Sequence, residues 1–105
     1  MIVTTGIAVT GSEISQILGV VRGVVVRSPN VGQTFLGGLQ GMMGGNIEMF
    51  AQVCDEARQH AFDRMVQHAE QMGADAIIGM RYDATEFAQS MAEVLAYGTA
   101  VKLKR

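Results

Sequence analysis

The stretch that decides the fold runs from residue 47 to residue 82 and reads IEMFAQVCDEARQHAFDRMVQHAEQMGADAIIGMRY. Over residues 47–72 the apolar side chains recur with the 3.6-residue period of an amphipathic helix. They are Phe50, Val53, Cys54, Ala57, Ala61, Met65, Ala69 and Met72. Gly73 follows where a left-handed residue commonly ends a helix, and a strand signal covers residues 74–82. This stretch therefore predicts one long helix that leads directly into a strand.

A second strong signal lies upstream, where residues 17–27 are rich in valine and end before Ser28-Pro29-Asn30. The composition predicts a long strand. Alternation assigns its apolar side chains to two faces, one with Ile17, Val21 and Val25 and the other with Leu18, Val20, Val24 and Val26. Because both faces are apolar, both must be covered.

The rest of the chain completes a small α+β pattern. We expect a short strand at 2–5, a short glycine-rich helix at 31–43, a polar loop at 83–90 and a strand at 91–104 that forms a hairpin with the strand at 74–82. The order is β-β-α-α-β-β. It predicts a single two-layer domain over residues 1–105, with one long helix on a small, mostly antiparallel sheet.

The composition adds a prediction about assembly. The chain has 105 residues, of which 49% are hydrophobic and 13 are glycine. Its mean hydropathy is +0.22. A domain of this size buries only about two-thirds of its unfolded surface, so a monomer would leave part of this apolar content exposed to water. One long helix covers one sheet face, and either the glycine-rich helix or a second subunit must cover the other. We favour a second subunit.

Charge and cysteine content exclude several classes of protein. The net charge is -2 and the only basic cluster is terminal, at Lys102, Lys104 and Arg105, so we expect no nucleic-acid partner. The single cysteine, Cys54, cannot form an internal disulfide, and the N-terminus lacks the pattern of a signal peptide. No segment reaches the roughly 18 apolar residues of a membrane span. These features predict a cytoplasmic protein without a membrane partner.

The polar side of the long helix offers one candidate metal site. Glu56, His60 and Asp63 lie at positions i, i+4 and i+7, so a helix presents all three on one face, and their side chains are ligand types for divalent metals. A solvated charged stripe has the same pattern, and we favour that interpretation. No metal is assigned, and no cofactor is expected.

The glycine-rich segment offers a second candidate. Gly44, Gly45 and Phe50 could border a crevice between subunits, where glycine lets a backbone approach a small ligand closely. Gly37, Gly41 and Gly45 repeat every four residues, which favours close packing over ligand binding. Cys54, on the apolar stripe, is expected to be a buried structural residue.

No catalytic constellation emerges from the residues. The glycines have neither the Walker spacing nor the G-x-G-x-x-G spacing of a phosphate loop, and no G-x-S-x-G elbow is present. We therefore expect no enzyme.

Several segments together resemble a known family. They are VVRGV at 20–24, Gly44-Gly45, GADAIIG at 73–79 and GTAV at 98–101. In this order and at this length they are similar to the YbjQ-like family of small bacterial proteins, labelled as heavy-metal-binding. The resemblance implies a dodecin-like subunit that assembles as a ring, a homopentamer with its sheets about the axis. The family label implies a divalent or heavy metal as ligand. The chain departs from the family pattern at Asn46, Phe50 and Ala51, so the resemblance carries the fold and no binding site.

Overall fold

A computed structural model describes residues 1–27, 47–88 and 91–104. The elements are β1 (Ile2–Val3), β2 (Ile14–Arg27), α2 (Ile47–Gln71), β3 (Ala76–Ala88) and β4 (Met91–Leu103). The strands form one sheet in the order β1-β3-β4-β2, in which β1 runs parallel to β3 and the other pairs are antiparallel. This confirms the predicted α+β class and the mostly antiparallel sheet. The predicted helix at 31–43 lies outside the described residues.

The GADAIIG segment, residues 73–79, ends α2 and begins β3 through a set of backbone hydrogen bonds. Gly73 adopts a φ of 76°, a left-handed conformation that glycine reaches without a Cβ clash. Its N–H bonds the carbonyl of Glu70 at 3.0 Å, and the next N–H, from Ala74, bonds that of Ala69 at 3.0 Å. These two bonds are those of a Schellman motif. Asp75 then accepts a bond from the Leu103 N–H at 2.9 Å, which fixes the start of β3 beside the end of β4.

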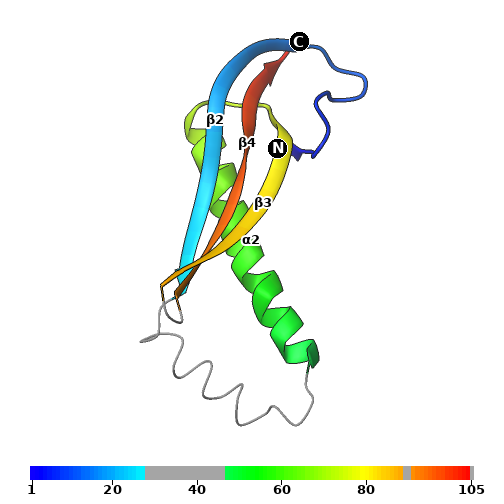
Figure 1. Cartoon of the computed structure of the whole chain (residues 1–105). Helices are drawn as coiled ribbons and strands as arrows, with labels where there is room; N and C mark the ends of the chain where they lie inside the picture. The colour runs from blue at the N-terminus through cyan, green and yellow to red at the C-terminus, as the bar shows by residue number, and fades with distance from the viewer. Residues whose placement is uncertain (28–46, 89–90, 105) are drawn as a thin grey trace.

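The core lies between α2 and one face of the sheet (Figure 1). The helix contributes Ala57, Ala61, Met65 and Ala69, all buried as the 3.6-residue period predicts. The sheet contributes Val21, Val25, Ile77, Met80, Ala96 and Ala100. Three alanines on the helix stripe keep α2 close to the strands.

The closest approach is at Gly23 of β2. A Cβ at this position would overlap the backbone oxygen of Ala61 and lie 2.5 Å from the backbone nitrogen of Met65. Only glycine therefore lets the helix backbone rest on the strand. Valine-rich composition predicted the strand but not this contact, because Gly23 is one of two glycines in residues 17–27 and nothing local distinguishes it from Gly19.

The predicted loop at 83–90 is wrong for most of its length. Strand β3 continues to Ala88, and Asp83, Thr85 and Glu86 pair with Leu95, Glu93 and Ala92 of β4. The polar composition indicated a loop because these side chains are exposed, and cross-strand pairing outweighs their low strand propensity.

The predicted face of Ile17 is also wrong. Strand β2 begins at Ile14, and its register against β4 shifts between Ile17 and Gly19. Such a bulge reverses the alternation of side chains. Leu18 consequently packs against the core, whereas Ile17 is 67% exposed.

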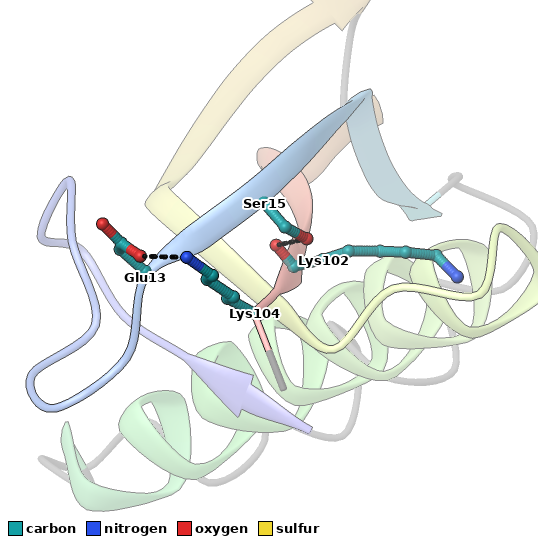
Figure 2. Close-up of polar contacts among 4 residues, drawn as sticks. All are labelled: Glu13, Ser15, Lys102 and Lys104. Atoms are coloured by element: carbon teal, nitrogen blue, oxygen red, sulfur yellow. Dashed lines mark hydrogen bonds and ion pairs between the residues drawn. The ribbon is translucent and has the colours of Figure 1, made fainter.

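Polar contacts join the start of β2 to the end of β4 (Figure 2). Lys104 donates its backbone N–H to the Glu13 carbonyl at 2.7 Å, and its ammonium lies 3.4 Å from the Glu13 carboxylate. The Ser15 hydroxyl donates to the carbonyl of Lys102 at 3.2 Å. The ion pair is well exposed and adds little stability, so the backbone bond is the stronger tie.

Candidate functional site

The sheet face turned away from α2 is the main candidate surface. Cross-strand pairing arranges its side chains in rows, each with one residue from β3, β4 and β2 in that order. The rows are Ile78, Thr99 and Val20; Arg81, Tyr97 and Arg22; Asp83, Leu95 and Val24; and Thr85, Glu93 and Val26. We call these twelve residues, together with Ile17, the open sheet face.

The open sheet face is aliphatic along β2 except at Arg22, and it carries the charged residues Arg81 and Asp83 along β3. Val20 is 69% exposed and Val26 is 48% exposed, although both are branched aliphatic residues in a regular strand. Tyr97 lies at the centre and is 38% exposed. Exposed aliphatic groups in such a continuous set are typical of a surface that another molecule covers.

Two helix side chains occupy part of the outer edge of β2. His68 accepts the N–H of Arg22 through Nδ1 at 3.2 Å, and the Arg64 guanidinium donates to the carbonyl of Val24. An unpaired strand edge is a template for another strand, and polar side chains that bond its backbone remove that template. The middle of the β2 edge is therefore satisfied by α2 itself.

The opposite edge is different. β1 pairs with Ala76 and Ile77, and Thr4 and Gly6 accept further backbone bonds from Met80 and Gly79. Among the described strands, none pairs with the outer side of β3 beyond Met80. Residues 81–86 of β3 are exposed at every position. The Tyr82 ring, on the helix side, has the Arg58 guanidinium 5.6 Å from its centroid. This half of β3 has little cover from the described chain.

The candidate metal residues lie on the solvent side of α2. Glu56, His60 and Asp63 are all exposed, and Asp63 accepts a bond from the Gln59 amide at 2.9 Å. His60 and Asp63 border an open hollow of about 330 Å³ together with Arg64 and Gln67, and Glu56 is not among its lining residues. Within residues 1–27, 47–88 and 91–104, no three His, Cys, Asp or Glu side chains are grouped closely enough to hold a metal ion.

The structure gives no side-chain environment for the candidate ligand-binding residues, and it places Cys54 at the surface. Gly44 and Gly45 lie outside the described residues, and Phe50 is placed only as part of the α2 backbone. The prediction that Cys54 is buried is wrong, since this residue is exposed. The buried stripe begins one turn later, at Ala57, because the N-terminal end of α2 diverges from the strands (Figure 1).

Comparison with known families decides the relationship. A family model described as "Putative heavy-metal-binding", the YbjQ model, matches residues 1–104. The chain belongs to the YbjQ family.

Curated relatives of this YbjQ chain are uncharacterised bacterial proteins. A UPF0145 protein from Chromobacterium violaceum is 52% identical over 102 residues, which cover 97% of this chain and 87% of the relative. One from Solibacter usitatus is 52% identical, with 96% and 90% covered, and one from Legionella pneumophila is 50% identical, with 96% of each covered. These names carry no enzymatic activity.

A solved structure supports the YbjQ fold. It is a protein of unknown function in the DUF74 family from Pediococcus pentosaceus, similar with a TM-score of 0.55 and 23% identity over 99% of this chain and 98% of the other. The likeness shows a shared fold. Within the described part of the chain, no helix combines the length and apolar character needed to cross a bilayer.

Proposed function

We propose that this YbjQ chain is a non-enzymatic subunit of a closed cytoplasmic homo-oligomer, a ring of five copies, in which neighbouring subunits cover the open sheet face. The observation that carries the proposal is the exposure of Ile17, Val20 and Val26 on a sheet whose other face is already packed against α2. The family resemblance supplies the number five.

The dimensions of the chain support the same proposal. Its Cα radius of gyration is 16.8 Å. A compact domain of this length has a radius of about 13 Å. The extended sheet therefore exposes more surface than an isolated domain of this size normally does, and association would bury it.

A charge on the open sheet face tests the proposal. Val20→Asp places a carboxylate on a residue that is 69% exposed in the isolated chain, so the subunit fold should persist. Burying that carboxylate at an interface is costly, and we expect the concentration for half-assembly to rise at least about tenfold. Sedimentation velocity over a concentration series measures it.

Ile7→Asp is the matched control, because Ile7 is 83% exposed and lies outside the four strands. It should leave the sedimentation coefficient unchanged. Equal assembly of wild type and Val20→Asp would rule out the open sheet face as the interface.

Divalent metal binding is the second candidate function, favoured by the hollow that brings His60 and Asp63 together. If His60 and Asp63 bind Zn²⁺, with Glu56 drawn in or water as a further ligand, calorimetric titration of the wild type should show one site per chain. His60→Ala should weaken binding at least about tenfold, and the control Glu70→Ala, on the same helix, should not. Identical flat traces for wild type and His60→Ala would remove this function.

A further inference from the structure

We infer that the oligomer is built through a heterologous contact, in which the β3 edge of one copy meets the β2 edge of the next and the Arg22 guanidinium pairs with the neighbour's Asp83 carboxylate. The inference rests on the proposed oligomeric function and specifies its interface. The occupant of each edge is a second copy of this chain.

The first observation is the state of β3. A strand is normally covered on at least one face, yet residues 81–86 are exposed on both. The outer edge of this segment also lacks a partner among the described strands. These residues have the exposure expected of a segment completed by another chain.

The second observation is that the two edges differ in kind. At the β2 edge, the Arg22 N–H and the Val24 carbonyl are already bonded by His68 and Arg64. A neighbouring strand cannot continue the backbone ladder there, so contact must run through side chains. The β2 edge is therefore unsuited to pair with a second β2 edge, and an isologous contact between like edges is disfavoured.

The third observation is charge. The described side chains at the β2 edge include Arg22 and Arg64, whereas Asp83, Thr85 and Glu86 follow one another along the exposed part of β3. Arg81, the one cation within residues 81–86, donates to the carbonyls of Thr5 and Met80 at 3.0 and 2.8 Å and is turned toward the N-terminal segment. The Arg58 guanidinium of α2 lies over Tyr82 on the helix side, away from the open sheet face. A basic edge thus lies across the sheet from an acidic one, which favours contact between unlike edges.

The geometry of such a contact allows a ring. Strands β2 and β3 both run antiparallel to β4, so they are parallel to each other at opposite edges of the sheet. Rotation about an axis roughly along the strands brings β3 of one copy beside β2 of the next, a heterologous contact that forms a ring when the rotation per subunit closes. If neighbouring copies met without a shift along the strands, Arg22 of one copy would face Arg81 of the next, because the two residues lie in the same row. A stagger of one row, of the sort that strand tilt imposes on closed sheets, puts Arg22 against Asp83.

Charge exchange tests the pair. Arg22→Glu and Asp83→Arg should each raise the concentration for half-assembly at least about tenfold, since each puts like charges together. The double variant, with both charges exchanged, should return to within about threefold of wild type. Glu70→Arg, an exposed charge reversal on α2, is the control and should assemble normally. Circular dichroism of each variant checks that the subunit is folded.

Thiol cross-linking gives an independent readout. In a Cys54→Ser background, Arg22→Cys and Asp83→Cys proteins are prepared separately, mixed, and treated with a short bismaleimide. The inference expects covalent dimers only in the mixture, because each contact joins position 22 of one copy to position 83 of another.

The outcomes separate the two proposals. A wild-type protein that stays monomeric overturns the oligomeric function and the inference with it. An oligomer that survives both single reversals, that is not restored by the double exchange, or that cross-links within the Arg22→Cys protein alone overturns the inference and leaves the oligomeric function standing.

Discussion

Gly23→Ala is expected to lower the free energy of unfolding by about 3 kcal/mol, the upper part of the range for overpacking a core. The added Cβ would overlap the Ala61 carbonyl oxygen and crowd the Met65 nitrogen. Both atoms belong to the helix backbone, which cannot rotate away as a flexible side chain can. Helix α2 would have to lift from β2, which would also weaken the bonds that His68 and Arg64 make to the strand edge.

Urea denaturation at one fixed protein concentration measures this effect, because association would otherwise shift the apparent stability. Gly6→Ala is the matched control. Its Cβ would lie 3.4 Å from the Thr4 hydroxyl oxygen, and we expect a change within about 0.5 kcal/mol. A Gly23→Ala protein as stable as the wild type would contradict the close contact between helix and strand.

Ile77→Ala should cost about 3 to 4 kcal/mol, in the range for deleting a large buried aliphatic side chain. Ile77 is fully buried and belongs to the cluster that joins β3 to α2. Packing around it is tight, since a Cβ on Gly98 would lie only 2.6 Å from its Cγ2. Because the β4 backbone at Gly98 is part of the wall around Ile77, the wall cannot easily move in to fill the cavity that the alanine leaves.

Ile7→Ala removes the same atoms from a side chain that is 83% exposed and should change stability by less than about 0.5 kcal/mol. Denaturation of the two alanine variants, again at equal protein concentration, makes the comparison. Similar losses in both would contradict the placement of Ile77 in the core.

The elements that local chemistry dictates could be predicted from the sequence. The alanine and methionine stripe gave the buried side of α2, and Gly73 gave its end, because a 3.6-residue period and a left-handed cap are local properties. The two-sided apolar character of β2 likewise predicted an uncovered sheet face, and Val20 and Val26 are exposed there.

The errors arose where tertiary structure overrides a local pattern. Periodicity could not show that β2 carries a bulge at Ile17, and polar composition could not show that residues 83–88 pair with β4. The helical stripe assigned Cys54 to the core, whereas the divergence of α2 from the sheet leaves it exposed.

The hydrogen bonds of His68 and Arg64 to the edge of β2 could not be predicted from the sequence either. Nothing in the spacing of His68 and Arg64 links them to β2, about 40 residues earlier, because the link depends on where the helix crosses the sheet. Glu56, His60 and Asp63 remain a prediction for metal titration.

Sedimentation equilibrium of the wild-type protein, from nanomolar to tens of micromolar, tests the central claim most directly. The account predicts a single assembled species with five times the 11.2 kDa mass of one chain, dissociating only at the lowest concentrations. A mass of 11.2 kDa throughout the series would mean that the open sheet face stays exposed to water, and would contradict the account.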